Sequence, residues 1–314
     1  MKLNLIIDGN YLLNKLVFTL HKSNILYGQL GKSLNMTYET YRTMYQFNKI
    51  FFVSDSREKS WRRELYPKYK KGRKKDTSIN WDFVYEIYEE FKNNLKNVYE
   101  ADSIEGDDMM HYIIKKTNAD GESNMILCND YDIKQELVYN LEPLFINFMY
   151  NDMQKSKLFL PKNYRFFKNE IDKYKYNAFD DSNDYKTKDF FNKLLQTHSI
   201  IEVDGKHSLL VKLVSGDNSD NIKSVYIVES KGKFRGIGEK GAISILDKID
   251  IDLDWKELFN EIAYTICEKK KVGVSEVDGI LKRLEENKRL IYLDNETIPH
   301  ELHNKIEELW KKNN

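Results

Sequence analysis

The sequence is short of the residues that break regular structure, cross-link a chain or anchor it in a membrane. Only four of its 314 residues are proline, and the two cysteines, Cys128 and Cys267, lie far apart. That spacing suits neither a disulfide framework nor a cysteine metal site. No apolar run reaches the ~20 residues of a membrane helix, and Asp8 interrupts the apolar start. Neither a membrane span nor a signal peptide is predicted, and a cytoplasmic protein is the default expectation.

The sequence also lacks an excess of charge of either sign, because 50 Lys and Arg residues balance 50 Asp and Glu residues. A protein that simply coats DNA would be basic, but a zero sum can hide strong local fields of both signs. What is present is 41% hydrophobic and 32% charged residues, which is typical of a helix-rich globular protein. The length suits one large domain or two ordinary ones.

Three short apolar runs separated by helical patterns predict buried parallel strands, and therefore an α/β fold with a mostly parallel central sheet flanked by helices. Each run is followed by acid. Ligand sites in such sheets lie beyond the carboxyl ends of the strands, so these acids are expected at one edge. A single such Asp is more often a turn former or helix N-cap, but three together are harder to explain that way. The runs are 3–7, 50–53 and 124–127, followed by Asp8, by Asp55, and by Asp130 with Asp132.

Two further segments add acids. SIEGDDMMHYIIKK predicts a helix start with Glu105, Asp107 and Asp108, whose charges could simply complement the helix dipole. VSGDNSDNIKSV supplies Asp217 and Asp220, for which an Asx-turn is the alternative interpretation.

The nine acids together favour a metal site. Oxygen ligands without His or Cys suit Mg²⁺, with Mn²⁺ as a substitute, rather than zinc. Two such ions ~3.5–4 Å apart suit in-line phosphodiester hydrolysis, whereas glycoside hydrolysis needs only two carboxylates. The predicted metal ligands are Asp8, Asp55, Glu105, Asp107, Asp108, Asp130, Asp132, Asp217 and Asp220.

Two basic or glycine-rich segments indicate nucleic-acid binding. Residues 57–75 are densely basic with interleaved aromatic side chains, which suit phosphates and unpaired bases, although a solvated basic segment has the same composition. The second segment, KFRGIGEKGAISIL, contains Gly236, Gly238, Lys240 and Gly241 before a helical pattern. It predicts a helix–hairpin–helix that grips a backbone phosphate, or else an ordinary turn.

The expected organisation is a nuclease domain at 1–200, with a basic arch or clamp at about 57–95, and a helical DNA-binding region at 201–314. The helix–hairpin–helix is expected at about 230–250. Further patterns predict helices at about 77–97, 254–271, 274–290 and 298–312, and an exposed loop at 177–189.

Together these motifs resemble the flap endonuclease-like 5′ nuclease family, and most of all its bacteriophage ribonuclease H and 5′ exonuclease branch. The resemblance spans roughly residues 4–246. Its specific parts are VSDSREKSWRRELYPKYKKGR and SGDNSDN. The motifs IIDGNYLL, SIEGDDMMHYI, CNDYDIKQ and GIGEKGA follow the family order but are individually modest.

The resemblance implies a PIN-like nuclease core and assigns roles to the residues. It places Asp8, Asp55, Glu105, Asp107 and Asp108 around the first metal, Asp130 between the ions, and Asp132, Asp217 and Asp220 on the second. It places Arg62, Lys70 and Arg73 beside the scissile phosphate with Tyr69 next to them, and makes Lys70 the candidate for steering the phosphate.

The resemblance also implies a two-metal, structure-selective 5′ nuclease that removes RNA primers and 5′ flaps from duplex DNA during replication. The implied activities are 5′-3′ exonuclease, flap endonuclease and ribonuclease H. Residues 57–95 would cover a single-stranded 5′ end, and GIGEKGA would hold the duplex, with a monovalent cation. A monomer is expected, in the host cytoplasm for a phage protein, with a single-strand-binding protein or sliding clamp as the candidate partner.

The sequence departs from the family at three places. Gly106 stands where alanine is usual, Asn129 precedes the Asp130 loop, and 223–235 is longer than in compact members. Two other hypotheses remain, a PIN-like ribonuclease for single-stranded RNA and a non-catalytic binding protein for branched DNA. The GIGEKGA segment and the second acid pair argue against the first. The complete set of carboxylates argues against the second, because without cations these acids would repel one another.

Overall fold

The computed structural model describes residues 2–44, 47–152, 156–173, 191–230, 233–295 and 297–314, so the predicted loop at 177–189 lies outside it. The chain forms two compact units. The sheet unit comprises Met1–Ser60, Lys75–Val203 and Ile298–Asn314, and the helical unit comprises Trp61–Lys74 and Asp204–Thr297.

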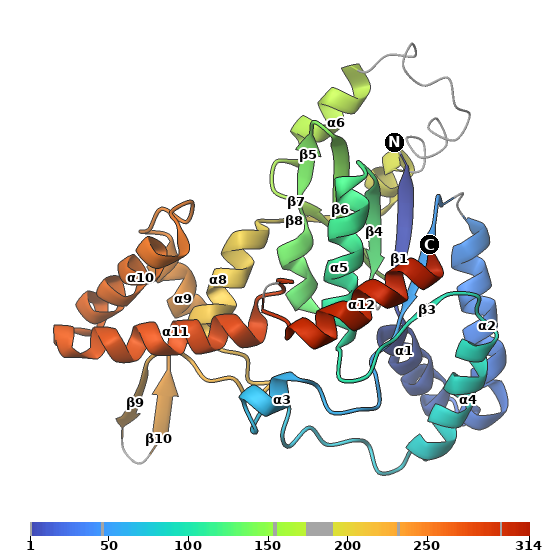
Figure 1. Cartoon of the computed structure of the whole chain (residues 1–314), viewed down its shortest axis with the longest axis horizontal. Helices are drawn as coiled ribbons and strands as arrows, with labels where there is room; N and C mark the ends of the chain where they lie inside the picture. Colours follow the sequence, from blue (N-terminus) through green and yellow to red (C-terminus); the bar gives the residue numbers. More distant parts are fainter. Residues whose placement is uncertain (1, 45–46, 153–155, 174–190, 231–232, 296) are drawn as a thin grey trace. The chain divides into compact units, whose positions relative to one another are not determined.

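The sheet unit is built on a mixed, mostly parallel sheet, which confirms the predicted fold class (Figure 1). In the described residues its path runs β3-β2-β1-β4-β6-β7-β8, with β5 paired to β6. Among the described strands of this sheet, only the β6–β7 and β5–β6 pairs are antiparallel. The strands are β1 (Leu3–Asp8), β2 (Ile50–Val53), β3 (Val98–Tyr99), β4 (Ser123–Leu127), β5 (Tyr139–Leu141), β6 (Leu144–Asn151), β7 (Lys157–Pro161) and β8 (Ser199–Val203).

The three predicted acidic strand ends are neighbours in this sheet. β1 lies between β2 and β4 and pairs in parallel with both. Asp8 is in register with Val53, and Ile7 with Leu127. The carboxyl ends of the three strands therefore meet at one edge, as the apolar runs predict, and the segments that follow them begin side by side.

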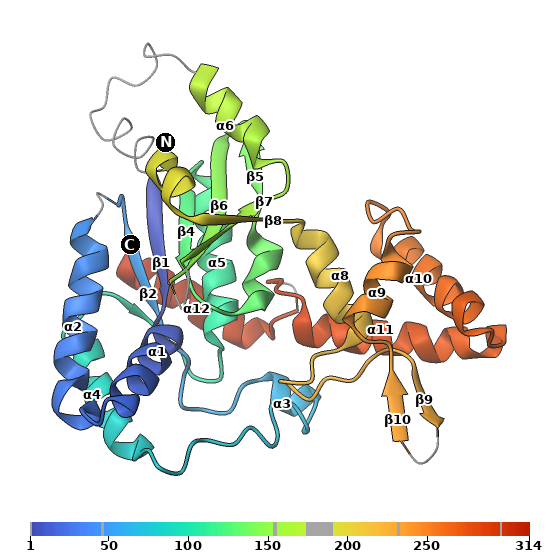
Figure 2. The ribbon, with the colours of Figure 1, turned by 180° about the vertical axis from the view of Figure 1, so that it is seen from behind.

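Helices cover both faces of the sheet. Phe51 and Phe52 are consecutive in β2, so their side chains point to opposite faces. Phe52 contacts Phe91 of α4, and Phe51 stacks on Trp310 of α12 at 5.8 Å between ring centroids. Figure 1 shows α5 and α12 in front of the sheet, and Figure 2 shows α1, α2 and α4 on the other side. The helices are α1 (Gly9–Lys22), α2 (Leu26–Met44), α4 (Trp81–Asn93), α5 (Gly106–Ala119), η1 (Tyr131–Glu136), α6 (Tyr164–Lys173) and α12 (His300–Asn313).

The helical unit packs its elements around a second core. The predicted C-terminal helices occur where their patterns place them, and the long segment before Gly236 forms an antiparallel two-stranded ribbon. Leu210, Ile262 and Leu284 from three of its helices are fully buried in that core. Its elements are α3 (Arg62–Leu65), α8 (Gly205–Ser215), β9 (Ile227–Ser230), β10 (Lys233–Gly236), α9 (Glu239–Leu246), α10 (Trp255–Lys270), η2 (Val274–Glu276) and α11 (Val277–Ile291).

Part of the predicted arch belongs to the helical unit. The aromatic ring of Tyr69 is buried in the core of that unit, and Tyr66 packs against the same core. Asn221 donates to the Lys68 carbonyl at 3.0 Å, which ties the basic segment to the SGDNSDN loop. Within its unit, the segment Trp61–Lys74 is thus held by contacts, whereas Lys75 and α4 belong to the sheet unit.

The last helix, α12, also belongs to a different unit from the one its sequence position suggests. Trp310 contacts Phe51, Tyr99 and Tyr112, which all belong to the sheet unit. Asn314 donates to the Tyr99 hydroxyl at 2.8 Å. The chain after Thr297 therefore returns to the sheet, and this differs from the predicted C-terminal region at 201–314.

We expect Trp310→Ala to lower the free energy of unfolding by about 3 kcal/mol, because it removes a large aromatic side chain that packs on Phe51. Chemical denaturation followed by circular dichroism measures the change. Lys312→Ala, an exposed change on the same helix, is the control. Equal stability of the two variants would contradict the packing of α12.

Candidate active site

The carboxyl end of β1 places Asp8 at the start of α1. The side chain of Asp8 accepts a hydrogen bond from the backbone N–H of Tyr11 at 2.9 Å and so caps the helix. Burial, and to a smaller extent the negative charges of Asp55 and Asp130, raise the pKa of Asp8 to about 7 against the lowering effect of the cap. This carboxylate is therefore costly to ionise unless a cation compensates its charge.

The end of β2 places Asp55 against two hydrogen-bond donors. Asn10 donates to one carboxylate oxygen, and the backbone N–H of Gly106 donates to the other at 2.6 Å. Gly106 is the first residue of α5, so Asp55 also meets the positive end of that helix. A Cβ on Gly106 would lie 3.0 Å from the Asp55 oxygen, which relates the departure from the family's alanine to this close approach.

The acids of SIEGDD sit at the beginning of α5, as predicted. Glu105 is the N-cap residue and Asp107 and Asp108 form the first turn. Asp108 is buried with 1% of its surface exposed, and Glu105 with 8%. The following apolar residues Met109 and Ile113 are buried, so the helix is fixed by its apolar face while its acidic start meets the edge of the sheet.

The acids after β4 form a local turn. Asp130 accepts a hydrogen bond from the Asp132 backbone N–H at 2.8 Å and caps η1. Cys128 lies in the interior just before them. Burial raises the pKa of its thiol well above the usual range, and the charges of Asp8, Asp130 and Asp107 raise it further. The thiol is thus a neutral neighbour of several carboxylates.

These pKa shifts show which acids of the sheet unit lie within electrostatic reach of one another. Asp8 is perturbed by Asp55 and Asp130, and Cys128 by Asp8, Asp130 and Asp107. Within the described residues, no three His, Cys, Asp or Glu side chains are placed to hold one metal ion. The assignment of ligands to ions therefore stays a prediction. The chemistry of the donors fits a hard divalent cation, because all the predicted ligands are carboxylates.

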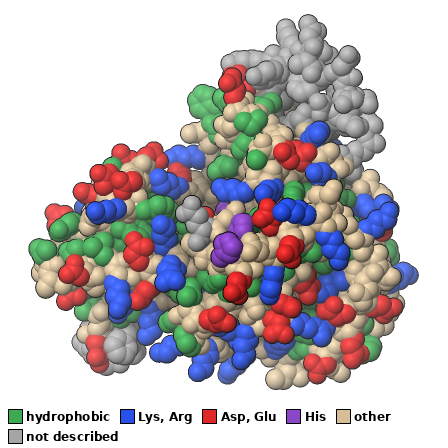
Figure 3. All heavy atoms as spheres, in the orientation of Figure 1, with side chains coloured by type: hydrophobic (Ala, Val, Ile, Leu, Met, Phe, Trp, Pro, Cys, Tyr) green, Lys and Arg blue, Asp and Glu red, His purple; other side chains and the backbone are tan. Residues whose placement is uncertain are grey.

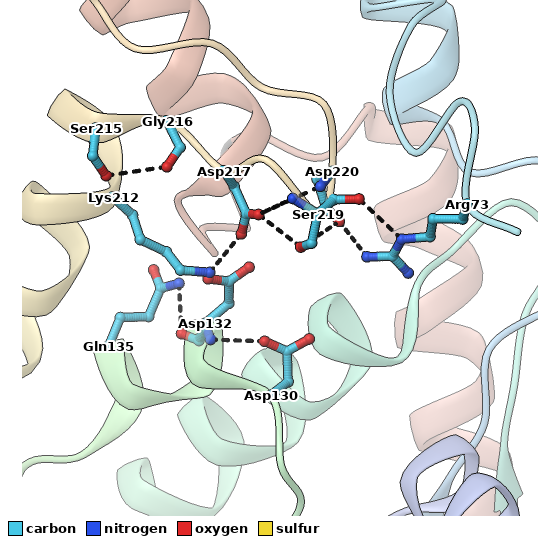
Figure 4. A network of polar contacts seen from close by, with 10 residues as sticks. All are labelled: Arg73, Asp130, Asp132, Gln135, Lys212, Ser215, Gly216, Asp217, Ser219 and Asp220. Carbon is cyan, nitrogen blue, oxygen red and sulfur yellow. Dashed lines mark hydrogen bonds and ion pairs between the residues drawn. The ribbon is translucent and has the colours of Figure 1, made fainter. Parts of the chain in front are cut away.

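In the helical unit, the SGDNSDN loop holds Asp217 and Asp220 in a network of donors (Figure 4). Asp217 accepts from the ammonium group of Lys212 at 2.8 Å and from the hydroxyl of Ser219 at 2.6 Å. Asp220 forms an ion pair with Arg73. Ser219 also donates its backbone N–H to Asp217 at 2.8 Å.

Gly216 makes this loop possible. Its φ of 73° and ψ of −178° lie in a region that side chains avoid. A Cβ would stand 2.5 Å from the Ile222 carbonyl oxygen, which the chain must approach to close the loop. The hydrogen bonds that close it run between the backbones of Asp217 and Ile222 at 2.7 and 2.9 Å.

The charges in this loop are compensated by side chains of the protein. Burial alone would raise the pKa of Asp217, but hydrogen bonds from Lys212 and Ser219 outweigh it and lower the pKa to about 2. Asp220 is buried and paired with Arg73. In this arrangement two cationic side chains occupy positions beside the two carboxylates.

The residues of the basic segment differ in burial and in their partners. The guanidinium of Arg62 is buried with 2% exposure and donates to the Leu290 carbonyl at 2.9 Å, so in the helical unit it links α3 to α11. Lys70 adopts a left-handed φ of 53°, and its backbone N–H donates to the Asp220 carbonyl at 2.9 Å. Its ammonium group lies 5.0 Å from the Tyr69 ring centroid. Arg73 is more exposed and pairs with Asp220.

The GIGEKGA segment forms the start of α9, with Gly238 at the N-cap. Ile237 is buried between the two exposed glycines, and its N–H donates to the Ser224 hydroxyl at 2.9 Å. Lys240 and Gly241 lie in the first turn of the helix. The backbone N–H groups of such a turn suit a phosphate, and the role of the segment in DNA binding stays a prediction.

Two polar partners of the acids were not identified from the sequence. Asn10 donates to Asp55, and Lys212 donates to Asp217. Asn10 follows Asp8 by two residues in IIDGNYLL, and Lys212 lies five residues before Asp217. The sequence held one clue to both partners, because each lies within a few residues of a predicted acidic ligand. Elsewhere on the surface, charges of both signs are interspersed over the face drawn in Figure 3, in line with a net charge of zero.

Comparison with known proteins identifies the family. Residues 3–165 match the family described as the 5′-3′ exonuclease, N-terminal resolvase-like domain. The match covers more than half of the 314 residues, and the chain belongs to this 5′ nuclease family. The sequence resemblance is thereby confirmed. A comparison with curated proteins found no match.

Solved structures with a similar fold come from bacteriophage T5. A T5 5′-exonuclease with zinc ions bound is 15% identical over 100% of both chains, with a TM-score of 0.63. A T5 flap endonuclease, described as a pseudo-enzyme-product complex with DNA and metal ions, is 15% identical over 99% of both chains, with a TM-score of 0.62. At this identity the likeness concerns the fold. No helix in the described part of the chain has the length and apolar character of a membrane span.

We expect Asp8→Asn to stabilise the metal-free protein as the pH rises. The folded pKa of Asp8 is about 7, above its ordinary value of 3.8, so stability is full at low pH and is lost as pH rises through 7. Asn keeps the helix cap but carries no charge. In EDTA, the melting temperature of Asp8→Asn relative to wild type should therefore increase by a few degrees between pH 5 and pH 8.

The control for this titration is Asp120→Asn, an exposed change at the far end of α5. Its melting temperature relative to wild type should not depend on pH in this way. If the difference for Asp8→Asn stayed constant from pH 5 to pH 8, the charge cost at Asp8 would be disproved.

Gly216→Ala should destabilise the protein by about 1–3 kcal/mol, because the new Cβ meets a carbonyl oxygen at a φ of 73°. Gly238→Ala is a matched control in the same unit, since its φ is −82° and nothing lies within 4 Å of the added carbon. Thermal unfolding of both variants tests the strained loop. Equal melting temperatures would show that the loop tolerates a side chain.

Proposed function

We propose that this chain is a structure-selective 5′ nuclease that hydrolyses phosphodiesters near 5′ ends and removes RNA primers and 5′ flaps from duplex DNA during replication. The observation that carries the proposal is the acidic edge of the sheet in a member of the 5′-3′ exonuclease family. There burial, and to a smaller extent the charges of Asp55 and Asp130, raise the pKa of Asp8. A bound cation would offset both the burial of this carboxylate and its repulsion by the neighbouring acids.

The proposed ligands are the nine acids identified from the sequence, with two Mg²⁺ ions as cofactors. When bound, the ions supply an activated water and stabilise charge on the attacking and leaving oxygens. Asp55 is oriented for this task by Asn10 and by the first N–H of α5, so its carboxylate is held in one direction. Asp217 and Asp220 would exchange their contacts with Lys212 and Arg73 for metal contacts, which would release two cationic side chains.

The basic segment divides into positioning and substrate-binding residues in this proposal. Arg62 is buried and holds α3 against the Leu290 carbonyl, which suits a positioning residue more than a contact to the scissile phosphate. Lys70 is the proposed phosphate-steering residue. Its left-handed backbone conformation is fixed by the N–H bond to Asp220, so its place along the segment is defined. Residues 57–95 would cover a single-stranded 5′ end.

The helical unit would hold the duplex. The GIGEKGA turn presents the start of α9 with Lys240 in its first turn, and a monovalent cation is the proposed additional ligand there. Ribonuclease H activity, monomeric action and a replication partner such as a single-strand-binding protein or clamp belong to the same proposal. These features rest on the family resemblance.

Cleavage assays test the function. A 5′-labelled flap duplex and an RNA primer on DNA are incubated with Mg²⁺ and with EDTA. Short 5′ products that require Mg²⁺ support the proposal, and the two substrates rank its roles. Tight flap binding without cleavage would instead indicate a non-catalytic binding protein. Cleavage of single-stranded RNA alone would indicate a PIN-like ribonuclease.

Asp132→Asn should reduce cleavage of the flap duplex at least about a hundredfold, because it removes a proposed ligand of the second metal. Binding of the flap in EDTA should change little. The control is Asp120→Asn, which lies at an exposed helix end. Wild-type activity of Asp132→Asn would refute its assignment as a metal ligand.

Lys70→Ala should lower kcat about tenfold or more while changing substrate affinity less, because its charge acts on the phosphate in the transition state. The neighbouring exposed Lys71 offers a matched control, Lys71→Ala. Single-turnover rates and binding in EDTA separate the two effects. An equal loss in both variants would show a general electrostatic effect of the segment.

A further inference from the structure

We propose that a basic pocket in the helical unit binds the terminal phosphate monoester of a nucleic-acid strand. The pocket has a volume of about 460 Å³ and lies between the end of α3, the chain just after the SGDNSDN loop, and α11. A volume of this size accommodates a nucleotide. The assignment of a nucleic-acid strand as the ligand rests on the proposed nuclease function, but binding at the pocket can be measured without cleavage.

One face of α11 forms a wall of the pocket. Arg283, Glu286, Asn287 and Leu290 are spaced three and four residues apart, so their side chains share that face. Asn287 is buried and donates to the carbonyls of Leu213 at 2.8 Å and Lys223 at 3.0 Å. The helix is thereby fixed to the chain that supplies the opposite wall.

The charges around the pocket favour an anion. Lys223, Arg283 and Arg289 contribute three positive charges and Glu286 one negative charge, so the lining carries a net charge of +2. All four side chains are exposed to solvent. Among the described residues none of the three cations forms an ion pair, although Arg283 also donates weakly to the Ser224 carbonyl at 3.4 Å. A phosphate monoester carries up to two negative charges, which matches this sum better than the single charge of a phosphodiester.

The walls of the pocket are held together by hydrogen bonds that do not involve its charged lining residues. Arg62 is almost fully buried and donates to the Leu290 carbonyl, so the end of α3 and the end of α11 are held together. The Tyr66 hydroxyl donates to the Asn221 carbonyl at 3.3 Å, which holds the chain at Ile222 and Lys223 near the end of α3. These bonds fix the backbone segments that carry the cationic side chains.

An apolar wall favours a nucleotide over a bare phosphate ion. Leu65 and the half-buried ring of Tyr66 line the pocket together with Leu290. An aromatic ring can stack on a base or pack on a sugar without selecting a sequence. The pocket thus offers a cationic part for the phosphate and an apolar part for the nucleoside.

The proposed reaction generates such a group. Water adds to the phosphorus and one P–O bond breaks, so one product strand keeps a phosphate monoester and the other ends in a hydroxyl. The pocket lining at Ile222 and Lys223 begins two residues after Asp220 in the chain. A pocket for a phosphorylated strand end would therefore serve a nuclease that acts repeatedly on its own products.

Binding of short oligonucleotides to the full chain in EDTA tests the pocket. Three fluorescent oligothymidylates are compared, with a 5′-phosphate, with a 3′-phosphate, or with hydroxyl groups at both ends. We expect at least one phosphorylated form to bind about tenfold more tightly than the hydroxyl form. Lys223→Gln and Arg283→Gln should abolish this preference, and Arg283→Lys should retain most of it. Thymidine 5′-monophosphate should compete, and thymidine should not.

Lys282→Gln is the matched control, because Lys282 is an exposed neighbour on α11 that does not line the pocket. Its preference for the phosphorylated strand should equal that of wild type. No preference in wild type, a preference that persists in both pocket variants, or an equal loss in Lys282→Gln would overturn the proposal. Competition by inorganic phosphate as strong as by the nucleotide would overturn the nucleotide assignment. A failure of Mg²⁺-dependent cleavage with intact phosphate preference would count against the nuclease function alone.

Discussion

Both units bury carboxylates whose negative charge has to be compensated. In the sheet unit, parallel pairing brings three strand ends together, and the charges of Asp55 and Asp130 help to keep the Asp8 proton bound up to a pH of about 7. Backbone N–H groups at the starts of α1 and α5 offset part of this cost. In the helical unit the same problem is solved by cations, since Lys212 and Arg73 face Asp217 and Asp220. The two units thus hold their acids in different ways, one by helix starts and the other by ion pairs.

The sequence predicts those features that depend on local chemistry. The apolar runs predict β1, β2 and β4, because a strand buried on both faces must be apolar throughout. The periodic patterns after residue 250 predict α10, α11 and α12 within a few residues. The positions of the acids at strand and helix ends follow from these elements, so most of the local geometry around Asp8, Asp55 and Glu105 was accessible before the structure.

Features that depend on packing between distant segments could not be predicted from the sequence. Arg62 looks like a phosphate ligand within a basic run, yet it is buried against a carbonyl 228 residues later. Tyr69 fits a base-stacking residue by composition, but its ring lies in the helical core. The pairing of Trp310 with Phe51 joins the last helix to the second strand, and nothing in either segment encodes the other. The ligand set of each ion likewise depends on side-chain positions that composition does not determine.

The chain crosses between the units four times, after Ser60, Lys74, Val203 and Thr297. Neither unit is therefore a continuous stretch of sequence. A fragment that began near residue 200 would lack the segment whose Tyr69 ring fills the helical core, and it would also carry α12 without the sheet on which Trp310 packs. Folding of each unit thus requires contacts between segments that are distant in sequence, so neither unit is expected to fold from one continuous fragment.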